Sequence, residues 1–348
     1  MSPASSVSER RLRSSKKEGK LLKRHAGLFE KIIDIDNLYL AHKNARKGKT
    51  HYADVQKVDQ DTEVYIEHLH FLLSEGLFET STYEKFVKVD KGKEREIYKL
   101  PYFPDRIVHW AVVQILEPIW LGCISRRSFS SIPGRGIHDG LRQLHKAMED
   151  RDGTAYCLKL DIKKFYPSIR HDLMKQVVRH KIKDARLLRL LDEVIDSMGG
   201  DRGVPIGNYL SQYFGNLFLS SFDRFVEDKG YHHRYFRYCD DIVVLGRGKG
   251  ELHALFTEIR DFLSDHLDLT VKENWQVFPT YVRGVDFLGY RSFGDYTLVR
   301  KRTVKSLKQT LKTKQGDDLR RSLASYNGWF SHADCFNLDR SIRKEVVT

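Results

Sequence analysis

YFRYCDDIVVL, residues 235–245, places two adjacent acids between two apolar segments. The apolar residues on both sides predict two short strands joined by a turn that contains Asp240 and Asp241. Aspartate is also common in ordinary turns, so the pair alone does not establish a functional site. The apolar flanks, however, predict that both carboxylates lie against a core, and buried carboxylates require a compensating cation. We therefore treat Asp240 and Asp241 as candidate metal ligands.

A second acid with the same setting lies upstream, in LKLDIKKFY, residues 158–166. Asp161 ends an apolar strand, which would be unremarkable for an isolated acid. If the two strand ends meet, their carboxylates can hold two Mg²⁺ ions about 3.5–4 Å apart, the arrangement used for in-line phosphoryl displacement. Magnesium prefers oxygen ligands and keeps phosphates and waters in its shell. The paired acids therefore predict a phosphoryl-transfer site.

The rest of the chain predicts an α/β or α+β core in which helices cover short strands. Pro118 is expected to bend or end the helix that contains it. Residues 86–98 alternate around a Lys-Gly pair, as in a β-hairpin. Helical spacing marks residues 28–44, 64–77, 105–120, 171–198, 208–228 and 251–266, and strand-like patterns mark 156–162, 231–245, 269–277 and 284–293.

Composition points to a polyanionic partner. The 348 residues contain 60 Lys and Arg against 47 Asp and Glu, a net charge of +13. Nucleic acid is the first candidate, and an anionic membrane surface is the second. No apolar run approaches the roughly 18–20 residues that span a bilayer, and the N-terminus lacks the apolar region of a secretory signal. Four scattered cysteines favour a reducing cytoplasm over a disulfide scaffold.

Basic side chains concentrate in two segments. The first 24 residues carry eight basic residues and two acids. They predict a loose basic arm that either binds phosphate or only solubilises the chain. Residues 300–321 carry nine basic residues and two acids on a mainly helical pattern.

Four motifs, in order, resemble those of reverse transcriptases. YCLKLDIKKFYPSI at residues 156–169 is similar to their first palm motif, and YCDD at 238–241 is similar to their YxDD hairpin. SFSSIPGRGIHDGLRQL at 128–144 resembles the fingers motif of bacterial and group II intron-type enzymes, and FLGY at 287–290 resembles the primer grip. The resemblance implies an α+β right-hand polymerase that extends DNA on an RNA template by two-metal nucleotidyl transfer.

The same resemblance implies a division of the chain into polymerase subdomains. Residues 1–60 would form the basic arm and a helix, and residues 61–150 the fingers. Residues 151–293 would form the palm with its antiparallel sheet, interleaved with fingers helices at 171–200. Residues 294–348 would form a short helical thumb.

Position within the motifs implies roles for the acids and for one lysine. Asp161 and Asp240 would bind two Mg²⁺ ions directly, the Ile162 carbonyl would complete the coordination shell, and Asp241 would support it. Lys272 lies where a lysine protonates the leaving pyrophosphate, although surface lysines are common.

Other positions are implied to bind the incoming nucleotide. Tyr166 matches the aromatic residue that blocks a ribose 2′-OH and so favours dNTPs, although it or Phe165 can equally be a core aromatic. Lys88 and Arg95 fall where fingers residues contact the triphosphate, whose leaving pyrophosphate needs charge neutralisation. The alternative for these two is a solvated basic hairpin.

A narrower resemblance lies in VPIGNYLSQ, residues 204–212. Most reverse transcriptases have Gln-Gly followed by Ser-Pro here, whereas this chain has Ile206-Gly207 and Ser211-Gln212. The departure is similar to reverse transcriptases of diversity-generating retroelements, which copy a template-repeat RNA with errors at adenines. Residues 325–338 also resemble that group. The resemblance implies that Ile206 and Gly207 lie at the nucleotide, and that a small basic oligomeric accessory protein is a partner.

The remaining implied contacts are with the nucleic acid. The primer strand would lie on Phe287, Leu288, Gly289 and Tyr290, and the thumb would follow the duplex backbone through Lys301, Lys305 and Lys308. The resemblance places a bacterial or phage-encoded protein in the cytoplasm, without a membrane partner. Three alternatives stay open: a retron or group II intron-type enzyme of ordinary fidelity, an RNA-dependent RNA polymerase, which Tyr166 argues against, and a non-catalytic RNA-binding scaffold.

Overall fold

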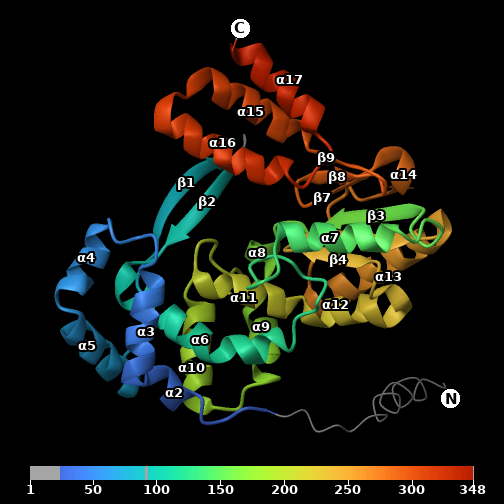
Figure 1. The fold of residues 1–348 in the computed structure, drawn as a ribbon. Helices are drawn as coiled ribbons and strands as arrows, with labels where there is room; N and C mark the ends of the chain where they lie inside the picture. Colours follow the sequence, from blue (N-terminus) through green and yellow to red (C-terminus); the bar gives the residue numbers. More distant parts are fainter. Residues whose placement is uncertain (1–23, 91–92, 348) are drawn as a thin grey trace, which may run out of the picture.

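A four-stranded antiparallel sheet of order β4-β5-β3-β6 lies at the centre of the fold (Figure 1). The computed structural model describes residues 24–90 and 93–347. The predicted basic arm before Arg24 and the Lys91-Gly92 turn lie outside the described residues. The strands are β3 (Tyr156–Asp161), β4 (Tyr235–Tyr238), β5 (Asp241–Gly246) and β6 (Gln276–Pro279), so the strand predictions around both acid motifs are confirmed.

Each face of this sheet contributes to a hydrophobic core, and alternate residues of β3 point to opposite faces. Leu158 and Leu160 belong to a large core beneath the helices, whereas Cys157 belongs to a second core that includes Phe129 and Phe287. Lys159 and Asp161 therefore share the face of Cys157. The helices that cover the first face include α11 (Tyr209–Phe218), α12 (Ser220–Val226) and α13 (Lys249–Leu267).

A second group of helices, drawn from residues 29–121 and 171–196, packs into the same large core. Pro118 lies inside α6, which continues to Leu121, so the proline does not end the helix. The predicted hairpin is confirmed as β1 (Glu84–Asp90) and β2 (Lys93–Lys99), and it rises from this group toward the C-terminal helices in Figure 1. The group comprises α2 (Phe29–Ile33), α3 (Ile35–Ala45), α4 (Ala53–Gln60), α5 (Thr62–Ser74), the π-helical turn η2 (Tyr102–Arg106), α6 (Ile107–Leu121), α9 (His171–Arg179) and α10 (Ala185–Asp196).

Residues 171–198 are helical, as predicted, and contacts distant in sequence divide them into α9 and α10. Ile182 forms a parallel bridge with His25, and Asp184 caps α10 by accepting from the Leu187 amide. The Asp184 carboxylate also accepts from the Leu28 amide at 2.8 Å. Helical periodicity alone does not reveal a break of this kind.

Two further predictions need correction. The helix expected over 208–228 is divided into α11 and α12 at Leu219 (φ −87°, ψ 2°), and is followed by a second π-helical turn, η3 (Glu227–Tyr231). In the strand expected over 269–277, only the end from Gln276 belongs to a strand, because the polar residues 272–274 turn away after a single bridge between Val271 and Ile162.

The C-terminal part comprises a small antiparallel sheet, β7 (Val285–Phe287), β8 (Tyr290–Ser292) and β9 (Thr297–Val299), followed by three helices. Tyr290, Leu307 and Phe330 belong to the core that joins them. The three helices are α15 (Lys301–Thr313), α16 (Gly316–Phe330) and α17 (Phe336–Val347), which confirms the helical prediction for 300–321. The remaining described helices of the chain are α7 (Ile137–Met148), α8 (Phe165–Ser168) and α14 (Thr280–Arg283). None of the helices in the described ranges is both long and apolar enough to cross a bilayer.

Candidate active site

Strand pairing gathers the three predicted acids at one end of the central sheet. Asp161 ends β3 and is the direct antiparallel partner of Asp241, which begins β5. Asp240 lies in the turn between β4 and β5, directly after Cys239, whose backbone has the left-handed conformation (φ 57°). The Ile162 amide donates to the Asp240 carbonyl at 3.2 Å, which ties the turn to the end of β3. The predicted convergence of Asp161, Asp240 and Asp241 is confirmed, and their roles remain predictions.

Asp240 and Asp241 lie in surroundings that favour their neutral forms. Burial raises the pKa of Asp241 to about 6, although Lys159 and Arg300 act in the opposite direction. Burial also raises the pKa of Asp240, and the nearby charge of Asp161 adds to that rise. Ionised carboxylates at this position therefore need cations beyond the side chains already present.

Two lysines lie against the acids. The Lys272 ammonium is 2.5 Å from Asp161 Oδ1, and the Lys272 amide donates to the Asp161 carbonyl at 2.8 Å. Lys272 therefore lies beside Asp161, and its predicted role as a proton donor remains a prediction. Lys159 Nζ is 3.6 Å from Asp241 Oδ1 and also donates to the Asp286 carbonyl. The sequence interpretation missed Lys159, although its position two residues before Asp161 on the same strand placed it on the same face.

The oxygen donors of the site fit Mg²⁺. Asp241 Oδ1 is buried and accepts no hydrogen bond from the described residues, so it is an acceptor without a donor. Within residues 24–90 and 93–347, no three His, Cys, Asp or Glu side chains gather closely enough to hold an ion by themselves. Mg²⁺ usually takes only one or two protein carboxylates and fills its shell with substrate phosphates and water. The predicted ligands Asp161, Asp240 and the Ile162 carbonyl would make a partial shell of this kind, and their binding of Mg²⁺ remains a prediction.

Tyr166 lies beside the acidic turn, whereas Phe165 belongs to the core. The Cys239 thiol donates to the Tyr166 hydroxyl at 3.6 Å, and burial raises the pKa of that hydroxyl. Phe165 is only 3% exposed. Gly215 allows both rings to approach α11, since a Cβ there would lie 3.1 Å from each ring. Of the two aromatics, Tyr166 is therefore the one placed at the site.

Ile206 and Gly207 lie against the β1–β2 hairpin, and their place at the nucleotide remains a prediction. The Tyr98 amide donates to the Ile206 carbonyl at 3.0 Å. Gly207 has φ +125°, and a Cβ there would lie 2.6 Å from the Tyr98 carbonyl oxygen. Only glycine combines this backbone conformation with so close an approach.

The two basic hairpin residues are less well placed. Lys88 is exposed on β1 and is the backbone partner of Arg95. Within the described part of the chain, no hydrogen bond or ion pair joins Lys88 to the three carboxylates. The side chain of Arg95 lies outside the described residues.

The Phe287–Tyr290 segment forms a tight turn between β7 and β8. Leu288 (φ 54°) and Gly289 (φ 91°) both have positive φ, as the hairpin turns that match strand twist require. The side chains of Phe287, Leu288 and Tyr290 are buried. A Cβ at Gly289 would overlap the Trp329 ring of α16, so the turn is packed against the C-terminal helices. A strand bound here would meet mainly backbone.

The predicted duplex-binding lysines lie on one face of α15, because they are spaced by four and three residues. Lys301 and Lys305 are exposed, and Lys308 is half-buried.

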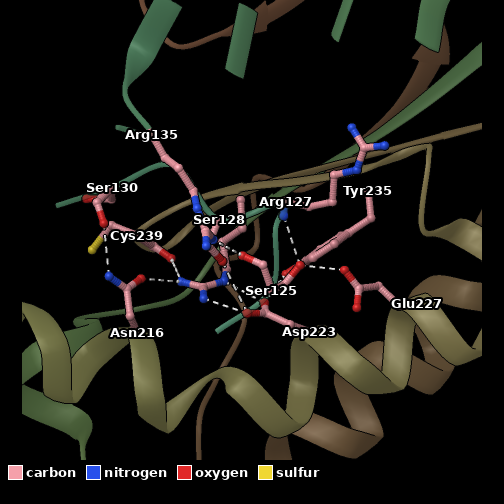
Figure 2. Close-up of polar contacts among 11 residues, drawn as sticks. Ser125, Arg127, Ser128, Ser130, Arg135, Asn216, Asp223, Glu227, Tyr235 and Cys239 are labelled. Atoms are coloured by element: carbon pink, nitrogen blue, oxygen red, sulfur yellow. Dashed lines mark hydrogen bonds and ion pairs between the residues drawn. The ribbon is translucent and has the colours of Figure 1, made fainter. Parts of the chain in front are cut away.

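A buried polar network beneath the acidic turn was not foreseen. Arg237 is 0% exposed and binds both carboxylate oxygens of Asp223, through Nε at 2.6 Å and Nη2 at 2.7 Å. Its Nη1 donates to the Cys239 carbonyl and to Asn216 Oδ1, each at 3.1 Å. Figure 2 shows Asn216 and Asp223 projecting from the helices, Asn216 below Cys239 and Asp223 near Ser128. A charged residue between apolar strand residues was the available signal, because a buried arginine needs an acidic partner.

The sequence of this chain matches the model of a known protein family over the region that contains the three acids. The sequence model of the family described as "Reverse transcriptase (RNA-dependent DNA polymerase)" matches residues 86–292, more than half of the chain. The chain belongs to the reverse transcriptase family. This reverse transcriptase has the family's right-hand polymerase fold, with mixed helices and antiparallel sheet.

Its relatives include bacterial and intron-encoded proteins. The reverse transcriptase is 26% identical to "Protein YkfC" of Escherichia coli (strain K12) over 260 residues, which cover 63% of this chain and 66% of that protein. It is 23% identical to "Group II intron-encoded protein LtrA" of Lactococcus lactis subsp. cremoris over 213 residues, which cover 57% of this chain and 35% of that protein. The chain thus spans at most two thirds of these relatives.

Among solved structures, an apo telomerase from Candida tropicalis, truncated from its C-terminal domain, aligns with a TM-score of 0.48 and 11% identity. The alignment covers 67% of this chain and 59% of that chain.

Proposed function

We propose that this chain extends a DNA primer on an RNA template at the end of the central sheet. The observation that carries the proposal is the pairing of Asp161 with Asp241 across β3 and β5, with Asp240 in the turn between β4 and β5. We assign the fingers to residues 61–150, the palm to 151–293 with helices of the fingers at 171–200, and the thumb to 294–348. Residues 1–60 carry the basic arm and a helix.

In this proposal Asp161, Asp240 and the Ile162 carbonyl hold two Mg²⁺ ions, and Asp241 supports them. When bound, the ions stabilise the charge on the attacking 3′-oxygen and on the leaving pyrophosphate. Lys272, already paired with Asp161, holds a proton beside the position of the leaving group and donates it to a pyrophosphate oxygen. Lys159 keeps the charge of Asp241 partly balanced before the ions bind.

Substrate selection follows from the neighbours of the turn. Tyr166, beside Cys239, excludes a ribose 2′-OH by its bulk and so selects dNTPs over rNTPs. Lys88 and Arg95 on the hairpin would neutralise the triphosphate once the hairpin closes over it. The exposed lysines of α15 bind duplex phosphates, and the turn at Leu288-Gly289 supports the primer strand.

The narrower proposal is error-prone synthesis in a diversity-generating retroelement. Ile206 replaces the glutamine of most reverse transcriptases at a position anchored to the hairpin, where an amide would hydrogen-bond and an isoleucine offers only apolar contact. The template-repeat RNA and a small basic oligomeric accessory protein would be its partners, in a bacterial cytoplasm. The alternative is a retron or group II intron-type reverse transcriptase of ordinary fidelity, and the similarity to LtrA supports reverse transcription in general without favouring either proposal.

Asp240→Ala tests the polymerase proposal. We expect loss of primer extension on a defined RNA template while RNA binding persists, because phosphate contacts elsewhere supply most of the affinity. The control is Asp54→Ala, which removes an exposed acid of α4. Extension by Asp240→Ala at the rate of the wild type would instead indicate an RNA-binding scaffold whose activity comes from a contaminant.

Ile206→Gln tests the narrower proposal. We expect fewer misincorporations opposite template adenines and little change opposite other bases, measured by deep sequencing of cDNA from one template. One lost interaction of this type is worth about 0.5–1.5 kcal/mol, up to about tenfold in discrimination. A low adenine error rate in the wild type itself would favour the intron-type alternative.

A further inference from the structure

Hydrogen bonds fix the peptide groups on both sides of Asp240 in the acidic turn. The peptide group before Asp240 carries the Cys239 carbonyl, which accepts a hydrogen bond from Arg237 Nη1 at 3.1 Å. The peptide group after it carries the Asp240 carbonyl, which accepts from the Ile162 amide at 3.2 Å. These two peptide groups meet at the Asp240 Cα. Fixing both therefore fixes φ and ψ of Asp240 and, with them, the direction of its Cβ and carboxylate.

The Arg237 contact also supports an unfavourable backbone conformation. Cys239 has φ 57°, a region that residues with a Cβ rarely adopt without support. A hydrogen bond from a charged guanidinium is among the stronger hydrogen bonds in proteins. Because Arg237 is completely buried, water does not compete for its donors.

Arg237 is itself held by groups from three segments. Asp223 of α12 binds Nε and Nη2, and Asn216 of α11 accepts from Nη1. Ser128 donates to Asp223 Oδ2 at 3.2 Å, and its segment pairs in parallel with Arg237 of β4. The guanidinium thus has a single orientation, in which one donor reaches the Cys239 carbonyl.

We propose that Arg237, oriented by Asp223 and Asn216, is a positioning residue that sets the direction of the Asp240 carboxylate for metal binding. The proposal rests on the proposed polymerase function of Asp240. Among the described residues, no hydrogen bond or ion pair joins the Arg237 side chain to the carboxylates of Asp161, Asp240 or Asp241. Arg237 therefore acts through the Cys239 peptide rather than on the metal. Groups in this outer position commonly change metal affinity by about 10- to 100-fold when they are removed.

The test must separate positioning from general stability. Arg237→Met alone would leave the Asp223 charge buried and unpaired, which is strongly destabilising. The double variant Arg237→Met/Asp223→Leu removes both charges together, and such apolar replacements often preserve folding. The matched control is Tyr235→Phe, which removes a hydroxyl that donates to the same Asp223 carboxylate at 2.5 Å but leaves the Arg237–Cys239 bond intact.

The measurement is Mn²⁺ affinity by electron paramagnetic resonance. The protein is bound to an RNA template with a dideoxy-terminated DNA primer and the next dNTP, so that no turnover occurs. We expect the double variant to bind site Mn²⁺ about 10- to 100-fold more weakly, with primer–template affinity and melting temperature close to those of the wild type. Tyr235→Phe should bind Mn²⁺ as the wild type does.

Unchanged Mn²⁺ affinity in the double variant would overturn the proposal, as would an equal loss in Tyr235→Phe. If the double variant does not fold, Arg237→Lys serves instead. A lysine keeps the charge beside Asp223 but lacks the planar fork that reaches two partners. It should weaken Mn²⁺ binding, and wild-type affinity in this variant would refute the positioning role. Full Mn²⁺ binding and activity in Asp240→Ala would refute the assignment of Asp240 as a metal ligand, whatever the Arg237 variants do.

Discussion

Asp241→Asn should stabilise the metal-free protein near neutral pH while it impairs DNA synthesis. Burial raises the pKa of Asp241 from 3.8 to about 6, so the native state binds a proton that the unfolded chain has already lost across that interval. The free energy of unfolding must then fall as pH rises from about 4 to about 6. Above about pH 6 the folded protein carries the full cost of the buried charge.

The size of the effect follows from the same interval. About two pH units at about 1.4 kcal/mol each give an upper bound near 3 kcal/mol. The carboxyl is 26% exposed and Lys159 lies 3.6 Å away, so solvent and the partial ion pair reduce that bound. We expect Asp241→Asn to raise the free energy of unfolding by about 1–3 kcal/mol at about pH 8 and by little at about pH 4.

Urea denaturation in EDTA, followed by circular dichroism at several pH values between about 4 and 8, measures this difference directly. Other titrating groups cancel because wild type and variant share them. A difference that does not grow with pH, or a variant less stable than the wild type at about pH 8, would refute the argument. Added Mg²⁺ should stabilise the wild type more than the variant, since binding to the native state alone shifts the equilibrium.

Three further predictions address the neighbours of the acids. Gly207→Ala should lower the melting temperature and raise the KM for dNTP, because its φ of +125° and the nearby Tyr98 carbonyl leave no room for a Cβ. The control is Gly48→Ala, at φ +68° with no atom within 4 Å of the added Cβ, and equal effects of the two variants would contradict the reasoning. Tyr166→Ala should increase rNTP use relative to dNTP in competition assays, and an unchanged ratio would move the sugar gate elsewhere. Lys301→Ala/Lys305→Ala should flatten the salt dependence of RNA–DNA duplex binding, since each lost phosphate contact reduces counterion release; an unchanged slope would remove α15 from the duplex interface.

The acid cluster could be predicted from the sequence because its strands are local patterns. Apolar residues on both sides of Asp240-Asp241 and before Asp161 define the ends of three short strands. The two strands around Asp240-Asp241 are joined by a tight turn, so they can only pair antiparallel. Lys272 could be placed only by resemblance, and its contact with Asp161 depends on the bridge between Val271 and Ile162.

The Arg237 network could not be predicted in the same way. Its partners come from the 125–130 loop, from α11 and from α12, and the bend at Leu219 that separates those helices has no proline or glycine to mark it. The split between α9 and α10 is similar, because the bridge from His25 to Ile182 joins residues more than 150 positions apart. Such features depend on tertiary contacts, which override local propensity.

The backbone hydrogen bond between the β1–β2 hairpin and Ile206 has a consequence for evolution. The bond from the Tyr98 amide reaches the Ile206 carbonyl, a main-chain group that every amino acid possesses. The close approach that excludes other residues falls instead on the neighbouring Gly207. Natural selection can therefore exchange the side chain at position 206 without dismantling the junction that holds the hairpin. Copying accuracy, if it resides in that side chain, is free to drift or adapt in a lineage whose architecture stays constant.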